Sequence, residues 1–354
     1  MYLVVCYIGY GSLVMWLIGV LANCIAIAAL TRNKELSSYF FNWLLTTLAI
    51  LDSMFLTCGA YDAIRQHFYQ SYYMDYTHVI LIHPLRSMLM VSSIYMLVVL
   101  SYERYKAVSE ATTYQGNINE IFNPWCHLGK YVMPVLIGST LLYIPKFLEL
   151  EISYRTITTS ANLTSGLNVT TKTISEIGFA QIRHNRAYVL WYVTVLNTLV
   201  TSIVPFLSLV YLNSKIYLGL QQVFVRRSTL RSSFRAQRPA ATERIRRNEY
   251  QTTVLFLIVW VFLFCHVLRL ILNIAEIINH ENERKANDYR CLGVKYWMLV
   301  TTVLSNFLLY VNSSINLFVY CIANEHLRGI LGKNITSISQ YTKKKALLVF
   351  WYYA

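Results

Sequence analysis

The chain has 354 residues, of which 56% are hydrophobic and 14% are charged, and its formal net charge is +14. Soluble domains carry roughly 25% charged residues, so this composition excludes an ordinary soluble protein and indicates an integral membrane protein. The positive residues gather in particular connectors between apolar stretches. That distribution argues against nucleic-acid binding and favours contact with the lipid bilayer and its anionic surface.

Seven apolar stretches follow one another along the chain, each near the roughly 20 residues that a helix needs to cross a bilayer. They cover residues 3–30, 39–60, 79–102, 131–150, 188–217, 251–275 and 296–320. We therefore predict an all-α membrane protein, a seven-transmembrane helix bundle. Residues 324–331 carry apolar positions on one side, which predicts a short amphipathic helix after the seventh span. The helical domain then covers 1–331, and a tail covers 332–354.

Two long connectors differ in composition, and this difference predicts the orientation. The connector 151–187 is rich in Thr, Ser and Asn and holds two glycosylation sequons, at Asn162 and Asn168. The connector 218–250 contains eight arginines. Sequons suit an outside loop and arginines an inside one. We expect a multi-pass protein of the plasma membrane with its N-terminus outside and a cytoplasmic C-terminal tail.

The third span carries a basic residue near each end. Arg86 precedes Arg104 by 18 positions, which is roughly 27 Å along a helix, so the two should lie near opposite faces of the membrane. A cation at membrane depth is costly, so Arg86 should line a polar cavity rather than face lipid. Met90, one helical turn from Arg86, is included in this expected ligand site.

The sixth span contains a helical stripe that becomes more polar toward the outside. Its members are Phe262, His266, Arg269, Asn273 and Glu276. Such residues on one face do not suit a surface that touches lipid. One interpretation is a ligand pocket shared with Arg86, and the other is polar contact between helices. We favour the pocket, because the stripe opens toward solvent.

A second polar group lies deeper in the predicted membrane. It comprises Asp52 in span two, Ser93 in span three, and Asn312 and Asn316 in span seven. A buried carboxylate needs a partner or a cation. The group suits a small cation such as sodium, or equally a hydrogen-bonded packing network. We expect no other cofactor and no structural metal.

The sequence lacks the short motifs of common enzymes. There is no GxSxG, no HExxH and no Gly-rich phosphate loop. A transporter usually shows paired halves with broken helices, and the chain has no such pairing. The sequence therefore indicates neither an enzyme nor a transporter.

Several short motifs, in order along the chain, resemble those of the rhodopsin-like (class A) G protein-coupled receptors. They are GVLANC with Asn23, LAILD with Asp52, SYERY with Glu103, Arg104 and Tyr105, and NLFVY with Asn316 and Tyr320 where the family has NPxxY. Within that family, YIPKFLEL and VFLFCHVLRLILNI resemble the FMRFamide-type neuropeptide receptors of invertebrates.

The resemblance implies a receptor that transmits the binding of an extracellular FMRFamide-like peptide to an intracellular heterotrimeric G protein. A chemosensory receptor for a small molecule is the alternative. The G protein would meet Glu103, Arg104, Tyr105 and Tyr320. At rest, Arg104 would pair with Glu103 and with Glu249 at the foot of span six.

The resemblance also bears on the ligand. Acidic residues near the outer rim, Asp62 and Glu149 among them, would suit the arginine of an amidated Arg-Phe peptide. Arg86 and Arg269 lie deeper and would bind a carbonyl, a carboxylate or an aromatic face. One departure from the family is plain, because span three begins without a cysteine and the connector 151–187 has none. The disulfide that usually joins them cannot form.

Overall fold

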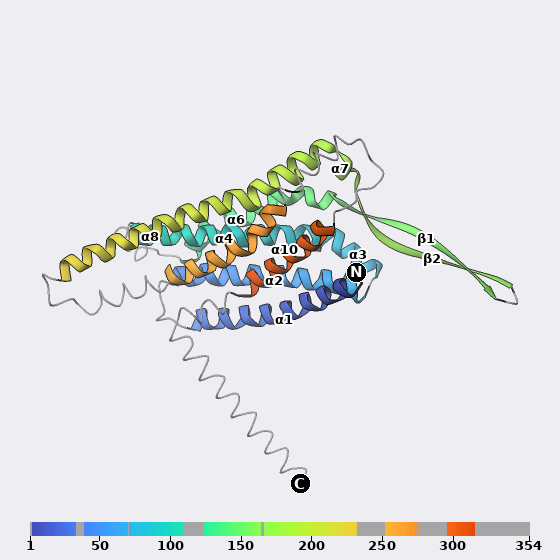
Figure 1. The fold of residues 1–354 in the computed structure, drawn as a ribbon, viewed down its shortest axis with the longest axis horizontal. Helices are drawn as coiled ribbons and strands as arrows, with labels where there is room; N and C mark the ends of the chain where they lie inside the picture. Colours follow the sequence, from blue (N-terminus) through green and yellow to red (C-terminus); the bar gives the residue numbers. More distant parts are fainter. Residues whose placement is uncertain are drawn as a thin grey trace, which may run out of the picture.

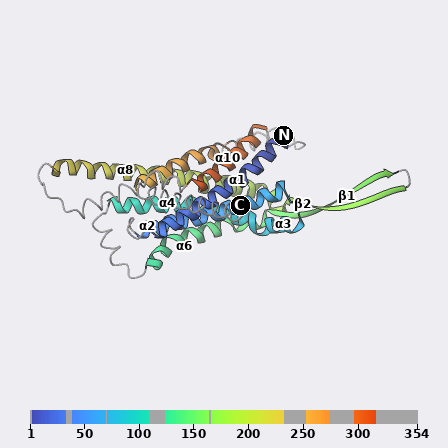
Figure 2. The ribbon, with the colours of Figure 1, turned by 90° about the horizontal axis from the view of Figure 1, so that it is seen from below.

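The computed structural model describes residues 2–32, 39–69, 71–109, 124–163, 166–231, 252–272, 275 and 296–315. Helices lie side by side in an elongated bundle, and a two-stranded hairpin projects from one end of it (Figure 1). The hairpin leaves from that same end in the perpendicular view (Figure 2). Six described helical segments are long and apolar enough to cross a membrane. The helix α10 (Tyr296–Ser314) packs against the first two of them.

The long helices correspond closely to the predicted spans. They are α1 (Tyr2–Arg32), α2 (Tyr39–His67), α4 (His83–Ser109), α6 (Pro124–Tyr143), α8 (Val204–Arg231) and the helix Thr252–Leu272. Shorter segments extend them: α3 (Tyr72–Thr77), η1 (His78–Ile82), η2 (Ile144–Leu148), α7 (Gln181–His184), η3 (Tyr188–Leu196) and η4 (Leu199–Ile203).

The third span is longer than its apolar stretch. With α3 and η1 included, it runs over Tyr72–Ser109, 38 residues, or roughly 57 Å at 1.5 Å per residue. The hydrocarbon core of a bilayer is only roughly 30 Å thick. Both ends of this span therefore reach beyond the hydrocarbon, which is why hydropathy predicted the shorter segment 79–102.

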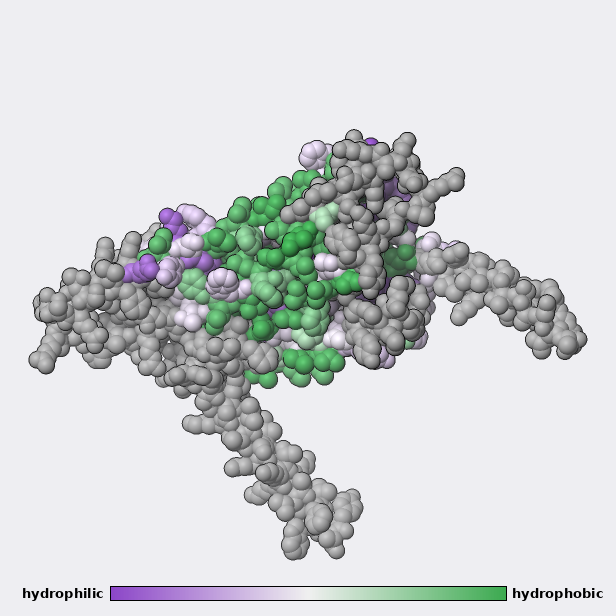
Figure 3. Space-filling view, in the orientation of Figure 1, coloured by the Kyte–Doolittle hydropathy of each residue, from purple (hydrophilic) through white to green (hydrophobic). Residues whose placement is uncertain are grey.

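The surface of the bundle is apolar around its middle, as a lipid-facing surface should be. Hydrophobic residues cover the central part of the face shown in Figure 3. The helix Thr252–Leu272 shows the division between lipid and core, since Trp260 is 69% exposed and Phe264 is 74% exposed, whereas Phe262 is buried. On this helix, large apolar side chains therefore face both the lipid and the core.

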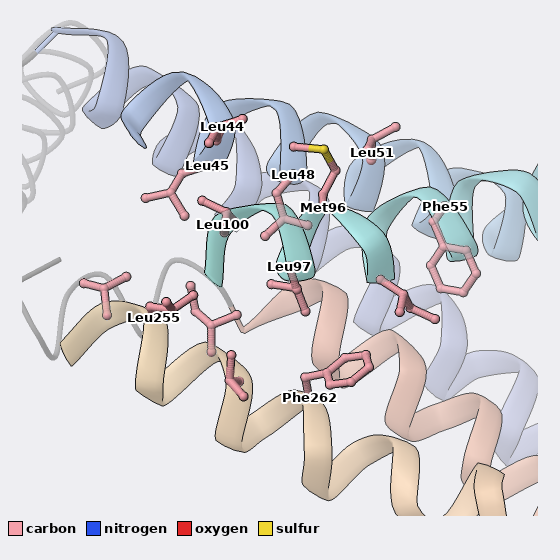
Figure 4. Packing of buried hydrophobic residues seen from close by; sticks show 14 of the residues in the cluster. Leu44, Leu45, Leu48, Leu51, Phe55, Met96, Leu97, Leu100, Leu255 and Phe262 are labelled. Carbon is pink, nitrogen blue, oxygen red and sulfur yellow. The ribbon is translucent and has the colours of Figure 1, made fainter. Parts of the chain in front are cut away.

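The core lies where α2, α4 and the helix Thr252–Leu272 meet. Leu48 of α2, Met96 and Leu97 of α4, and Leu255 and Phe262 of the sixth span converge there (Figure 4). Lipid tails are as apolar as leucine, so leaving lipid gains little hydrophobic energy for these side chains. Close packing holds the helices together instead.

Small residues allow α1 to approach its neighbours closely. A methyl group added at Gly19 would overlap Ser314 of α10 and would come within 2.6 Å of Leu56 Cδ1 of α2. One helical turn further along, Asn23 Nδ2 donates a hydrogen bond of 2.9 Å to the carbonyl oxygen of Ser313. This side of the bundle thus combines a small residue with a polar contact, as is common between membrane helices.

The hairpin pairs β1 (Leu150–Leu163) with β2 (Gly166–Phe179) in antiparallel register, from Leu150 opposite Phe179 to Leu163 opposite Gly166. The two strands are rich in threonine and isoleucine, and such β-branched residues favour strands. The composition of 151–187 predicted a connector rather than this hairpin. Both sequons lie near its far end.

We predict that Gly19→Ala destabilises the helix bundle, because the added methyl group overlaps Ser314 and Leu56. Overpacking of this kind costs about 1–3 kcal/mol. Gly11→Ala on the same helix is the matched control, because a methyl group there meets nothing within 4 Å. The thermal midpoint of the purified protein in detergent should be lower for Gly19→Ala than for Gly11→Ala. Equal midpoints would show that the close approach at Gly19 is not tight.

Candidate functional site

A pocket opens between α1, α2, α4 and α10, toward the end of the bundle that carries the hairpin. Its lining residues are Ser12, Gly59, Asp62, Ala63, Gln66, His67, Arg86, Asn306, Phe307 and Tyr310. The pocket has a volume of about 200 Å³. Pockets that enclose a whole small ligand are roughly 300–1,000 Å³ in volume, so this one suits the end group of a ligand.

Arg86 is the cation of this pocket, and its charge is matched. Its Nη1 donates to Asp62 Oδ2 at 2.8 Å, and its Nη2 donates to Tyr310 Oη at 3.0 Å. The guanidinium also lies 5.7 Å from the ring centroids of both Phe55 and Tyr310. Gly59 allows this arrangement, because an added methyl group there would come within 2.6 Å of the Tyr310 ring. Arg86 thus faces a polar pocket, with Asp62 as its counter-ion.

The second oxygen of Asp62 belongs to a longer polar chain. Asp62 Oδ1 lies 2.6 Å from His78 Nδ1 and 3.9 Å from Arg65 Nε. Arg65 Nη1 in turn donates to Asp75 Oδ1 at 3.0 Å. Ser175 Oγ of β2 donates to the other oxygen of Asp75 at 2.7 Å. Contacts therefore run without a break from the hairpin to α10.

A second cluster lies at the base of the hairpin, around the buried Glu149. Lys146 Nζ and Tyr188 Oη each donate to its carboxylate at 2.8 Å. His83 Nε2 lies 3.8 Å away and Arg183 Nη1 lies 4.0 Å away. Burial alone would raise the pKa of Glu149, but the contacts with His83, Lys146 and Tyr188 outweigh it and lower that pKa to about 2. Glu149 is therefore ionised at physiological pH.

The described residues of the sixth-span stripe do not line the pocket, but Arg269 bonds to Asn306, which does. The His266 ring is buried and stacks on Phe262, with centroids 4.1 Å apart. Arg269 Nη1 donates to Asn306 Oδ1 at 3.1 Å, and Asn306 lines the pocket. Met90 packs against the hydrophobic core. Among the described residues, the lining includes Arg86 but not Met90, His266 or Arg269; Asn273 and Glu276 lie outside the described residues.

The deeper polar group is present in part. Ser93 Oγ donates to Asp52 Oδ1 at 2.6 Å, and both residues are buried. Asn312 lies in α10, and Asn316 lies outside the described residues. The pair offers a carboxylate and a hydroxyl, which suit a small cation. The same hydrogen bond also suits a packing network, so both interpretations of the sequence stay open.

The opposite end of α4 holds the motif expected to meet a G protein. Arg104 donates twice to the neighbouring Glu103, from Nε at 2.5 Å and from Nη2 at 2.7 Å. The guanidinium also lies 4.2 Å from the ring centroid of Phe41. Tyr105 packs against the core, whereas Tyr320 and Glu249 lie outside the described residues. The expected pairing of Arg104 with Glu103 is present.

Several residues in and around the pocket were not predicted from the sequence. Tyr310, His78, Arg65, Asp75 and Ser175 were not predicted as site residues. The position of Arg65 three residues after Asp62 is a signal that the sequence does contain, because residues three apart on a helix are neighbours. Nothing in the sequence indicates that Ser175, 100 residues away in the chain, meets Asp75.

Comparison of the sequence with those of known proteins identifies its family. The model of the 7 transmembrane receptor (rhodopsin family) matches residues 22–320. The chain therefore belongs to the rhodopsin family of seven-transmembrane receptors and is a multi-pass membrane protein. This membership confirms the predicted seven-helix bundle, and it confirms the expectation of a receptor rather than an enzyme.

Two relatives have similar sequences. The FMRFamide receptor of Drosophila melanogaster is 25% identical over 329 residues, which are 90% of this chain and 51% of the relative. The FMRFamide peptide receptor frpr-18 of Caenorhabditis elegans is also 25% identical over 329 residues, 90% of this chain and 67% of the relative. The resemblance to FMRFamide-type receptors is confirmed. The chain spans about half the length of the fly relative.

We predict that Glu149→Gln lowers the thermal midpoint by a few degrees at neutral pH. A carboxyl group with a lowered folded-state pKa stabilises the protein above its ordinary pKa and loses that contribution as pH falls. The difference from wild type should therefore be constant between pH 7 and 5 and should shrink as pH falls from about 4.5 toward about 2. Glu151→Gln is the control, because Glu151 is exposed on β1. A difference that stays undiminished as pH falls to about 2 would contradict this account.

Proposed function

We propose that the chain is a G protein-coupled receptor for an extracellular amidated neuropeptide of the FMRFamide type. The observation that carries this proposal is the outer pocket with the Asp62–Arg86 pair in its lining. The names of the two relatives favour a peptide ligand over the chemosensory alternative. In this proposal the hairpin end of the bundle faces outward, and the peptide enters from that side.

The Asp62–Arg86 pair suits a terminal carboxamide. An amide group carries two N–H donors and one carbonyl acceptor. Its NH₂ group would donate to the Asp62 carboxylate, while its carbonyl would accept from the Arg86 guanidinium. A free peptide acid is less suitable, because its carboxylate would be attracted by Arg86 but repelled by Asp62. The charge balance of the pair thus selects a neutral, dipolar end group.

Exposed aromatic residues near the hairpin offer a surface for the rest of the peptide. Tyr72 stacks on Tyr154 of β1 with centroids 6.0 Å apart, and it lies 5.7 Å from Tyr73 and 6.1 Å from Tyr76. All four rings are exposed. Tyrosine is enriched at protein interfaces, and its face attracts a guanidinium. An arginine next to the amidated end therefore has a suitable contact here.

The opposite end of the bundle is the proposed site of G-protein contact and faces the cytoplasm. The Glu103–Arg104 pair lies there, and α8 projects past the rest of the bundle at the end away from the hairpin (Figure 1). The arginines of the connector 218–250 begin on this projection, with Arg226 and Arg227. Positive residues gather on the cytoplasmic side of membrane proteins, which supports the proposed orientation.

We predict that Asp62→Asn reduces the preference of the receptor for an amidated peptide over the same peptide with a free C-terminal carboxylate. Wild-type receptor should respond to the tetrapeptide amide FMRFamide with an EC50 at least about tenfold below that of the same peptide as a free acid, the effect of roughly 1.4 kcal/mol. Asp62→Asn removes the negative charge that repels a peptide carboxylate. The EC50 of the free-acid peptide should therefore fall relative to that of the amidated peptide. Calcium and cAMP readouts in expressing cells measure both peptides.

Ser12→Ala is the matched control, since Ser12 lines the same pocket without a charge. An N-terminal epitope detected on intact cells verifies surface expression and tests the proposed orientation. An unchanged ratio in Asp62→Asn would contradict the placement of the terminal amide. Silence toward both peptides, despite surface expression, would contradict the neuropeptide proposal and favour a small-molecule ligand.

We predict that Glu103→Gln raises basal signalling several-fold. The substitution replaces the carboxylate that accepts two hydrogen bonds from Arg104, so Arg104 is released toward the cytoplasmic side. Glu103→Asp keeps the charge and should keep basal activity close to that of wild type. Basal cAMP or inositol phosphate, normalised to surface expression, measures both variants. Equal basal activity in wild type and Glu103→Gln would show that this pair does not hold the receptor at rest.

A further inference from the structure

No disulfide joins the hairpin to the helix bundle. Residues 149–187 contain no cysteine, so noncovalent contacts hold the hairpin in place. Beside the Glu149 cluster, the described contacts include the Tyr72–Tyr154 stack and the hydrogen bond from Ser175 to Asp75. The Ser175 contact differs from the stack because it joins the hairpin to the ionic chain that ends in the pocket.

Asp75 is the residue through which the hairpin joins this series of ion pairs. Its side chain is 0% exposed, so its charge depends on its partners. One carboxylate oxygen accepts from Arg65 at 3.0 Å, and the other accepts from Ser175 at 2.7 Å. Removal of either partner leaves a buried acceptor without a hydrogen bond, which is costly. The position of the hairpin and the position of Arg65 therefore depend on one carboxylate.

Arg65 lies between two carboxylates at unequal distances. Its guanidinium is 3.0 Å from Asp75 and 3.9 Å from Asp62. At equal screening, the attraction across the longer distance is about three quarters of that across the shorter one. The Coulombic part of the preference of Arg65 for Asp75 is thus small, and the hydrogen bond that Arg65 donates to Asp75 adds to it. It depends on how much of the Asp62 charge is already matched by Arg86 and by His78, which lies 2.6 Å from Asp62.

We propose that Arg65 and Asp75 are positioning residues that couple the pocket to the hairpin. When Arg86 donates to a ligand carbonyl, Asp62 loses part of its counter-charge, and Arg65 moves toward Asp62 and away from Asp75. The base of the hairpin then loosens. Conversely, a firmly seated hairpin keeps Arg65 on Asp75 and leaves Asp62 to Arg86. The ligand half of this proposal rests on the proposed function, whereas the ionic coupling does not.

The first experiment needs no ligand. Amide hydrogen exchange of purified receptor in detergent is followed in the segment 172–179 of β2. Asp75→Asn should accelerate exchange there about fivefold or more, because a neutral acceptor binds Arg65 and Ser175 more weakly. Arg86→Gln should accelerate exchange in the same segment about threefold, although Arg86 does not touch the hairpin. Thr77→Ala on α3 is the control, since Thr77 Oγ1 bonds only to its own helix at Tyr73 O among the described contacts.

Two outcomes would overturn the proposal. If Asp75→Asn accelerates exchange and Arg86→Gln does not, the hairpin is anchored at Asp75 but is not coupled to the pocket. If neither variant changes exchange in 172–179, Asp75 does not anchor the hairpin. Ser175→Ala keeps both charges and removes only the hydroxyl donor, so it tests the anchor if Asp75→Asn does not fold.

The second experiment uses the peptide FMRFamide as the probe. Because ligand binding and loosening of the hairpin favour the same arrangement, Asp75→Asn and Ser175→Ala should lower its EC50 about tenfold without changing the maximal response, although neither residue lines the pocket. The double variant Asp75→Asn/Arg86→Gln should show no such gain over Arg86→Gln alone, because coupled residues are not additive. Additive effects would overturn the coupling. A wild-type receptor that is silent toward FMRFamide would overturn the proposed function, and the exchange experiment would still decide the coupling.

Discussion

The low dielectric between membrane helices is the constraint on which the rest of the structure depends. A charge there must be matched, because leaving water costs several kcal/mol for each ion. The bundle meets this requirement in three layers. Asp62 matches Arg86 near the hairpin end, Ser93 donates to Asp52 in the middle, and Glu103 matches Arg104 at the end away from the hairpin. The first two contacts join neighbouring helices, whereas Glu103 and Arg104 are adjacent residues of α4.

The layer at the hairpin end differs from the other two because it continues out of the bundle. The other two layers involve neighbouring positions or neighbouring helices, whereas this one passes from α10 through α4 and α2 to α3 and then to β2. A ligand in the pocket therefore meets groups whose partners lie on several elements at once. An interaction with one such group redistributes charge among the others, and this is the physical requirement for a conformational response.

The sequence predicted the helices well, because crossing a bilayer imposes a length and a hydropathy that are local properties. It also predicted that Arg86 faces a polar cavity. It could not predict which residues complete that cavity, since Tyr310 is 224 positions away from Arg86 and the rotation of α10 decides which of its residues faces inward. The polar stripe on span six was visible, but its Arg269 reaches the pocket through Asn306. The hairpin was missed because its many threonines suit both a strand and a solvated loop.

The length of the hairpin has a mechanical consequence. From Leu150 to Asn162 the strand extends roughly 40 Å at about 3.3 Å per residue, and the hairpin stands clear of the bundle (Figure 1). A sugar chain on Asn162 or Asn168 would sit at the tip of this arm, away from the mouth of the pocket. A sideways force on the tip would exert a torque on the base of the hairpin, where Ser175 donates to Asp75. The arm would therefore make the charge arrangement of the pocket sensitive to lateral force as well as to chemistry.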